Sequence, residues 1–219
     1  MFATLSLPAQ LAMAAGALAV IAVIFLLAIR SGLVPERVLL GGIALTALAD
    51  AVIGFLGASG DPRALFLMRW LSGSTYNAGF SLAGLAAVAV VALLPLALLS
   101  RRWLELLPLG DAVASARGVG VSRARSVLLL LAGLMSAAAT LCVGPLSFVG
   151  LMAPHAARLL GLRRPAEMII GAALLGGGLM TFADWVGRIA IFPYEIPAGL
   201  AASLIGAPFL VMLMRGKGG

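Results

Sequence analysis

Few side chains in this sequence could do acid–base, metal or nucleophilic chemistry. There is one histidine, His155, one cysteine, Cys142, and there are eight carboxylate residues among 219. His155 follows Pro154 and has no second His, no Cys and no nearby carboxylate with which to form a metal site. Cys142 lies in an apolar run, where packing explains it, and a single cysteine can form no internal disulfide. We therefore expect no catalytic centre, no bound metal and no cofactor.

Two carboxylates, Asp50 and Asp184, fall inside apolar segments, where a charge is costly unless it faces a partner or water. Asp184 stands four residues before Arg188, a spacing that places two side chains on one face of a helix. The sequence therefore predicts an ion pair between these two residues. Asp50 has no evident partner, and we assign it a polar contact within a helix bundle.

The elements that carry these residues are predicted to be membrane helices. Apolar residues make up 63% of the chain and charged residues 11%, and the mean hydropathy is +1.15. A bilayer accommodates such a composition, because each spanning helix needs about 20 mostly apolar residues. The net charge of +7 does not indicate nucleic-acid binding, because the Arg residues stand in short runs between apolar segments and no basic stripe alternates with aromatic residues. The fold class predicted is an all-α integral membrane protein.

About seven apolar segments are long enough to be helices. The shortest of them is marginal for a full span, and we expect it to be tilted or broken at Pro154. The segments are Leu7–Ile29, Val38–Ala58, Gly79–Leu99, Val127–Val143, Leu146–Leu160, Ala166–Ile191 and Ile196–Met214.

The distribution of Arg and Lys predicts the orientation of these helices. With the C-terminus in the cytoplasm, strict alternation puts 12 of the 15 basic residues on the cytoplasmic side and 3 outside. Cytoplasmic loops of membrane proteins carry this excess of positive charge, and moving the assignment by one helix would reverse it. The three outer residues are Arg63, Arg69 and Arg188.

The connection at about 101–126 is a long cytoplasmic loop in this topology. It reads RRWLELLPLGDAVASARGVGVSRARS, and its Pro and Gly residues divide it into short helical pieces. Short helices with glycine hinges could dock in a groove on a partner protein and move as one body. The alternative is a solvated basic loop that sets topology and binds nothing.

Two long motifs carry a resemblance to a known family. Gly144 to Arg164 reads GPLSFVGLMAPHAARLLGLRR, and Phe182 to Pro208 reads FADWVGRIAIFPYEIPAGLAASLIGAP. Both resemble motifs of the FecCD/BtuC-like permeases, the membrane-spanning subunits of ATP-driven importers, and most of all the C-terminal half of the iron(III)-hydroxamate branch. The loop segment LGDAVASARGVGV, Leu109 to Val121, resembles the family's coupling segment, although Ser115 and Arg117 depart from the usual pattern.

The resemblance implies a single transmembrane permease domain over 1–219, the C-terminal part of a ten-helix unit that lacks about three helices. It implies an ATPase-coupling role for part of the loop, a translocation path near the first motif, and contact of Arg188 with a periplasmic binding protein. The coupling residues are Leu109, Gly110, Asp111, Ala114 and Gly118, and the motif residues are Gly144, Pro145, Phe148, Gly150, Pro154, His155 and Arg158.

The predicted function is inward transport of iron(III)-hydroxamate siderophores across the bacterial cytoplasmic membrane. Its partners would be cytoplasmic ATPase subunits, a periplasmic siderophore-binding protein, a second permease unit and membrane lipid. The chain has no GxxxxGK[ST] motif, so ATP hydrolysis must come from other subunits. Alternatives are a permease for another iron-siderophore, haem or cobalamin, and an ion-coupled secondary carrier. An intramembrane serine protease is disfavoured, because the nearest nucleophile-like text, Gly73 to Thr75, falls in an outer loop, away from His155.

Overall fold

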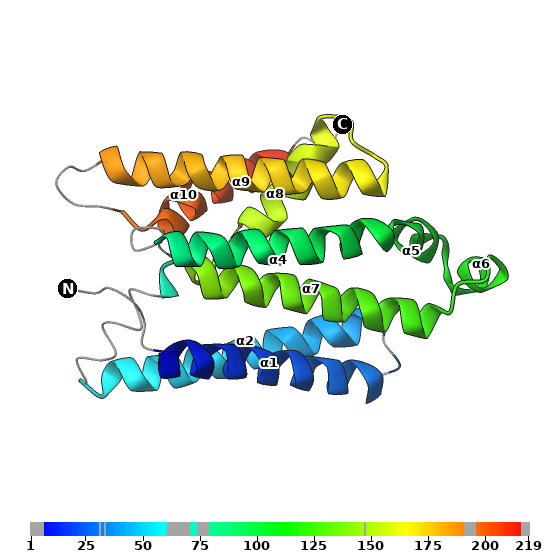
Figure 1. Ribbon diagram of the computed structural model, residues 1–219, viewed down its shortest axis with the longest axis horizontal. Coiled ribbons are helices and arrows are strands. Elements are labelled where there is room, and N and C mark those ends of the chain that lie inside the picture. Colours follow the sequence, from blue (N-terminus) through cyan, green and yellow to red (C-terminus); the bar gives the residue numbers. More distant parts are fainter. Residues whose placement is uncertain are drawn as a thin grey trace. The chain divides into compact units, whose positions relative to one another are not determined.

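A computed structural model describes most of the chain. The described backbone comprises residues 7–30, 32, 34–60, 71–73, 79–146, 148–190 and 196–215. Within these ranges every regular element is a helix (Figure 1). The elements are α1 (Leu7–Arg30), α2 (Pro35–Ala58), α4 (Phe80–Leu99), α5 (Arg101–Leu106), the 3₁₀ helix η1 (Leu107–Leu109), α6 (Asp111–Ala116), α7 (Val121–Val143), α8 (Val149–Leu159), α9 (Pro165–Ile189) and α10 (Ala198–Arg215).

Each of the seven predicted apolar segments contains a helix. Among the residues that the structure describes, four stretches are long and apolar enough to cross a membrane, namely Glu36–Ala58, Leu82–Leu99, Val121–Val143 and Pro165–Ile189. Shorter apolar stretches occur at Ala15–Arg30 and Ala198–Phe209. The all-α membrane fold predicted from the composition is therefore confirmed.

The structure corrects two predicted details. The helix expected from Val127 begins six residues earlier, at Val121, so the end of the segment taken as a loop belongs to α7. The segment Leu146–Leu160 is not broken at Pro154, because α8 runs through that residue from Val149 to Leu159. Proline inside a membrane helix is tolerated where neighbouring groups compensate the one lost hydrogen bond. With 11 residues and a rise of 1.5 Å each, α8 is about 17 Å long, too short to span a bilayer.

Local sequence explains several helix ends. Proline occupies the first position of α2 and of α9, where its missing N–H costs no intrahelical bond. Gly161, with φ +84°, ends α8: its N–H donates to the Arg158 carbonyl at 3.0 Å, and the Leu162 N–H donates to the Ala157 carbonyl at 3.1 Å. These two bonds form a Schellman motif, which requires a left-handed residue that glycine supplies without strain.

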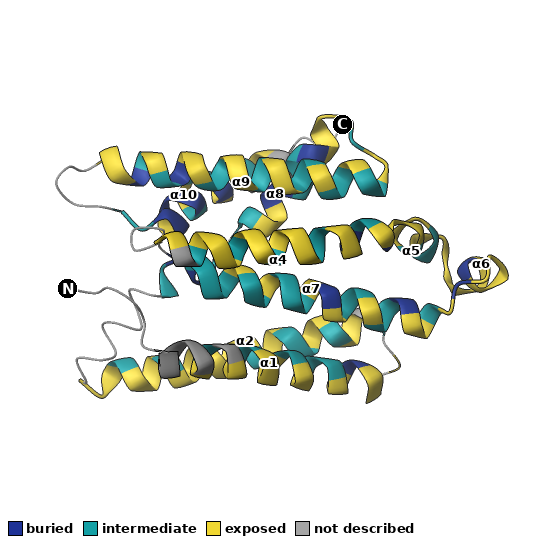
Figure 2. Cartoon of the chain, viewed as in Figure 1, coloured by how far each residue is buried: buried dark blue, intermediate teal, exposed yellow. Residues whose placement is uncertain are grey.

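The chain divides into two compact units. The first comprises Met1–Met68 and Leu85–Leu141, and thus holds α1, α2, α5, η1, α6 and most of α4 and α7. In this unit α1 packs along α2, and Ile21 of α1 lies against Gly133 of α7. Little of α1 and α2 is buried among the described side chains (Figure 2). Exposed apolar side chains of this kind suit a lipid or protein environment.

The second unit comprises Arg69–Gly84 and Cys142–Gly219, and α8, α9 and α10 pack against one another in it. Its core is built from the small residues Ala183, Ala201 and Ala202, with larger apolar residues around them. Small residues let helix backbones approach closely, which is how membrane helices associate in the absence of a strong hydrophobic driving force. In Figure 2 most buried positions of this unit lie on α8, α9 and α10, the three helices that pack against one another.

Candidate functional site

The loop between α4 and α7 is a structured element, made of α5, η1 and α6. Gly110 has φ +100° and begins α6, and Gly118 has φ +78° and follows its end. The Gly118 N–H donates to the Ser115 carbonyl at 2.9 Å, and the Val119 N–H donates to the Ala114 carbonyl at 3.0 Å. This is a second Schellman motif, and a side chain at Gly118 would be strained in the left-handed conformation it needs.

A small apolar core holds the loop together. Ala114, Val119 and Ala124 are buried, and Trp103, Leu106, Leu107 and Val121 pack against them. Ala114 and Val119 are the two residues whose apolar contact commonly accompanies a Schellman motif. The core therefore joins α5, α6 and the first turn of α7 into one body.

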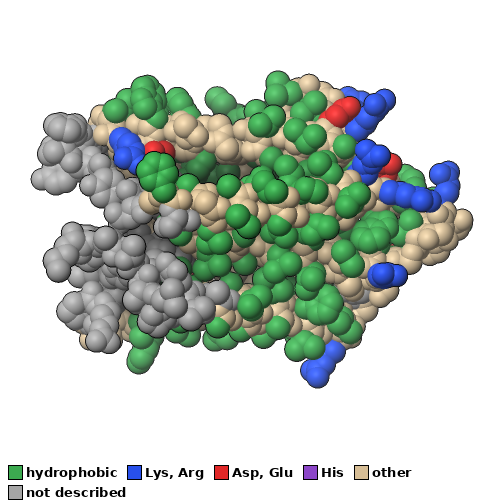
Figure 3. All heavy atoms as spheres, viewed as in Figure 1, with side chains coloured by type: hydrophobic (Ala, Val, Ile, Leu, Met, Phe, Trp, Pro, Cys, Tyr) green, Lys and Arg blue, Asp and Glu red, His purple; other side chains and the backbone are tan. Residues whose placement is uncertain are grey.

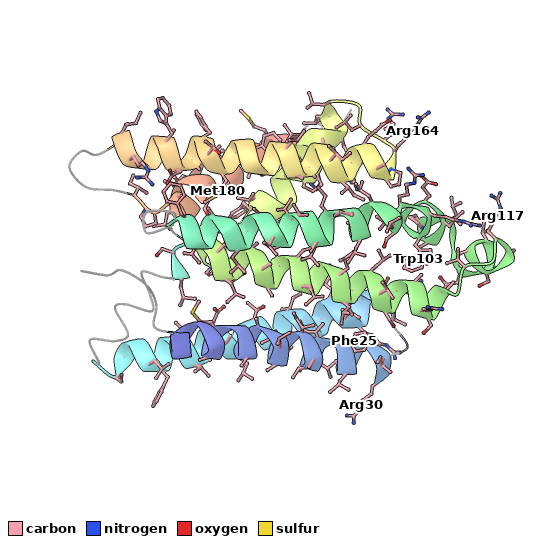
Figure 4. The ribbon with its side chains drawn as sticks, in the orientation of Figure 1. Phe25, Arg30, Trp103, Arg117, Arg164 and Met180 are labelled. Carbon is pink, nitrogen blue, oxygen red and sulfur yellow. The ribbon has the colours of Figure 1, made fainter. Side chains whose placement is uncertain are left out.

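Polar contacts reinforce the same body. Arg125 Nη2, on α7, donates to Asp111 Oδ1, the first residue of α6, at 2.6 Å. Arg102 Nη2, on α5, donates to the Arg117 carbonyl at 3.3 Å. Trp103 turns toward the loop core and Arg117 points away from α6 (Figure 4).

The five predicted coupling residues differ in what the structure lets them do. Leu109, Gly110, Asp111 and Gly118 are exposed, and a partner protein could reach them. Ala114 is fully buried in the loop core, so its contribution is to packing. Sequence reasoning missed Arg125 as the partner of Asp111, because 14 residues separate them.

The second candidate region is the connection from α7 to α8. Helix α7 ends at Val143, and the buried Gly144 has φ +79°. Phe148, which directly precedes α8, has φ +65°, an uncommon conformation for a bulky residue. The interruption of the helix at Gly144 and Pro145 agrees with the sequence analysis.

Glycines allow close contacts around this connection. The Gly199 N–H donates to the Gly73 carbonyl at 3.0 Å, and a Cβ on Gly73 would lie 2.7 Å from the Pro145 carbonyl oxygen. A Cβ on Gly206 of α10 would lie 2.7 Å from Phe148 Cβ. The structure therefore brings together three segments that are far apart in sequence. The contact of Gly73 with Pro145 could not be predicted from the sequence, because nothing local to either residue signals it.

The remaining motif residues lie on α8. Gly150 is exposed and has open space where a side chain would be. His155 is partly buried, and its Nδ1 lies 2.7 Å from the Leu151 carbonyl oxygen, one turn earlier on the helix. Pro154 is partly buried, and Arg158 is exposed near the end of α8. His155 thus has a local structural partner, and no group of three or more metal-ligating side chains occurs in the part of the chain that the structure describes.

The predicted ion pair on α9 is present. Arg188 Nε donates to Asp184 Oδ2 at 2.9 Å, and both side chains are partly accessible. Phe182 and Trp185 are exposed on the same part of the helix, with ring centroids 6.0 Å apart. Arg164, at the other end of α9, marks the side that the topology assigns to the cytoplasm (Figure 4). Asp50 is exposed on α2, and the text Ser74–Thr75 lies outside the described residues.

Comparison with known proteins identifies the family to which the chain belongs. The model of the FecCD transport family matches residues 1–216, which is almost the whole chain. The chain belongs to the FecCD transport family. This membership confirms the family resemblance that the two long motifs indicated.

Relatives in the FecCD family are longer than this chain. It is 50% identical over 200 residues to the iron(3+)-hydroxamate import system permease protein FhuB of Salmonella typhimurium, which covers 91% of the chain but 29% of FhuB. It is 36% identical to the hemin transport system permease protein HmuU of Yersinia pestis, covering 91% of the chain and 60% of HmuU. The chain thus spans less than a third of FhuB and about three fifths of HmuU.

A solved structure has the same fold. It is an ABC transporter of the metal-chelate type in an inward-facing conformation, with a TM-score of 0.80 and 26% identity. The match covers 89% of this chain and 63% of the solved chain. This FecCD chain therefore shares the fold of that solved chain over most of its length.

Proposed function

We propose that this FecCD chain is part of the permease of an ATP-binding-cassette importer that carries iron(III)-hydroxamate siderophores into the cell. The observation that carries the proposal is the 50% identity to FhuB over 91% of the chain. Relatives named for hemin and vitamin B12 transport are 36% and 34% identical. The membrane is the bacterial cytoplasmic membrane, and the cargo arrives with its iron already chelated, so the permease needs no metal ligands of its own.

The structured loop is the part of the chain that the ATPase subunit would contact. The chain has no phosphate-binding motif, so the energy must come from a cytoplasmic ATPase subunit. A loop held by its own core and ion pair can transmit a rigid-body motion of the ATPase to α7, whose first turn belongs to the same core. The coupling contact would involve the exposed residues Leu109, Gly110, Asp111 and Gly118.

Two further partners complete the proposal. A second permease unit, fused or separate, would form the translocation path together with the Gly144–Arg158 region, as FhuB is more than three times as long as the matched region. A periplasmic siderophore-binding protein would dock near Arg188 through acidic residues. Charge complementarity at such a rim contributes mainly to orientation and to the rate of association.

Transport in proteoliposomes tests the function. The chain, with any sequence that flanks it in its gene, is reconstituted with its ATPase and binding protein, and uptake of radiolabelled ferric hydroxamate is compared with uptake of haem and cobalamin. We expect hydroxamate uptake that requires ATP. Uptake of haem or cobalamin instead would support the alternative cargo, and uptake driven by a proton gradient without ATP would support a secondary carrier.

Capture of the ATPase tests the coupling loop. We expect Gly118→Asp to lose binding to the ATPase in a pull-down from detergent, because the left-handed Gly118 conformation is needed for the Schellman motif. Gly120→Asp is the matched control, since it adds the same charge at a position without a positive φ, where the nearest atom to an added Cβ is at 3.9 Å. Equal binding by both variants would contradict the role assigned to the loop geometry.

A further inference from the structure

The outer surface of the loop combines apolar side chains with positive charge. Leu109, just before α6, is 58% exposed, and Val113, on α6, is 41% exposed. Both are apolar residues in a region of the chain that the topology places in water. Exposed apolar side chains rimmed by polar residues are typical of a surface that another protein covers.

Arginines surround these two side chains in the sequence of the loop. Residues 101–126 contain five Arg and two carboxylates. One Arg and one carboxylate, Arg125 and Asp111, neutralise each other at 2.6 Å. Glu105 is the other carboxylate, and the four Arg that remain exposed are Arg101, Arg102, Arg117 and Arg123. Figure 3 shows basic side chains near α5 and α6, so the loop surface that a partner meets carries positive charge as well as the exposed apolar side chains of Leu109 and Val113.

The pair Asp111–Arg125 determines how this surface is held. It connects the first residue of α6 to the first turns of α7, and the Arg125 side chain is 27% exposed. The loop core already joins Ala114 to Ala124, so the ion pair adds a second connection between the same two helices, at another point. The core packs α6 against α7, and the ion pair adds a polar connection at the first residue of α6, so the direction in which α6 points depends on both.

We propose that Asp111 and Arg125 form a clasp that orients α6, so that Leu109 and Val113 enter an apolar groove whose rim carries carboxylates on the ATPase subunit. This inference rests on the proposed function and adds to it the chemistry of the partner surface and the device that aims the loop. Asp111 acts through Arg125 and is a positioning residue. The four exposed arginines supply attraction that salt screens.

The experiment measures binding of the full chain, in lipid nanodiscs, to its ATPase subunit across a range of salt concentrations. We expect Leu109→Ser and Val113→Ser to weaken binding at least tenfold at every salt concentration. Arg117→Gln with Arg123→Gln should weaken binding mostly at low salt. All four residues are exposed, so the variants are expected to remain folded, which elution as a single species would verify.

The clasp has its own matched control. Asp111→Asn should weaken binding several-fold, whereas Glu105→Gln, which removes the same charge from an exposed carboxylate without an ion pair in the described structure, should not. The exchange Asp111→Arg with Arg125→Asp should restore binding. If the clasp only stabilised the loop, its loss in Asp111→Asn would lower the melting temperature and leave the ratio of ATP hydrolysed to substrate carried unchanged. This ratio is therefore measured as well, and it is expected to rise in Asp111→Asn.

The outcomes separate this inference from the proposed function. If the unmodified chain does not bind the ATPase, the proposed function fails and the inference with it. If it binds, but Asp111→Asn behaves like Glu105→Gln or the exchange restores nothing, the clasp is refuted and the function stands. If the Arg variants lose binding to anionic-lipid vesicles and keep full binding to the ATPase, the positive surface serves the membrane and the proposed groove is refuted.

Discussion

The substitution Gly206→Ala tests the close contact between α10 and the start of α8. A Cβ at Gly206 would lie 2.7 Å from Phe148 Cβ and 2.8 Å from Met152 Sδ. The Met152 sulfur can move aside, but Phe148 Cβ is attached directly to the backbone that begins α8. Forcing one extra carbon into such a contact costs about 1–3 kcal/mol. The substitution should therefore push α8 and α10 apart.

Gly177→Ala on α9 is the matched control. Both glycines lie within helices, so both variants gain a similar helix propensity of about 1 kcal/mol, and an added Cβ at Gly177 meets nothing within 4 Å. The difference between the two variants should be the packing cost alone. At about 2–4 °C for each kcal/mol in a chain of this length, Gly206→Ala should melt about 2–12 °C below Gly177→Ala.

The assay is thermal unfolding in detergent, followed by circular dichroism at 222 nm and by the fraction that still elutes as a single species after heating. Both variants are compared with the unmodified chain at one detergent concentration. Equal melting temperatures for Gly206→Ala and Gly177→Ala would refute the close approach of α8 to α10.

Two further substitutions test the loop core and the contact at Gly73. Ala114→Leu should unfold the loop locally, because Ala114 is fully buried and a larger side chain does not fit there. Limited proteolysis should then cleave the loop at least several-fold faster. Ala112→Leu, at an exposed position of the same helix, should leave the cleavage rate unchanged. Gly73→Ala should lower the free energy of unfolding by about 1–3 kcal/mol, because Gly73 has φ +66° and an added Cβ would lie 2.7 Å from the Pro145 carbonyl oxygen. Gly79→Ala is the control, because a Cβ there meets nothing within 4 Å. Equal melting temperatures of the two variants would show that the contact between Gly73 and Pro145 is absent.

Apolar segments long enough to be helices could be read from the sequence because the apolar residues needed to face lipid form continuous runs. The start of α7 could not, because Ser122, Arg123 and Arg125 interrupt the apolar run while the helix continues through them. Apolarity reports the environment of a helix and not its hydrogen bonding. For the segment at Pro154 the sequence left a tilt or a break open, and the break is wrong for a related reason: one lost hydrogen bond does not end a helix when neighbouring groups compensate for it.

The sequence by itself determined the local features of this protein: its apolar helical segments, the interruption at Gly144, and the ion pair of Asp184 with Arg188, which a single helical turn separates. Tertiary structure decided what depends on contacts between distant segments. It buried Ala114 inside the loop, paired Asp111 with Arg125, and brought Gly73 against Gly199. The reason is that helix periodicity fixes neighbours three or four residues apart, whereas contacts across a turn or between helices depend on how whole elements pack.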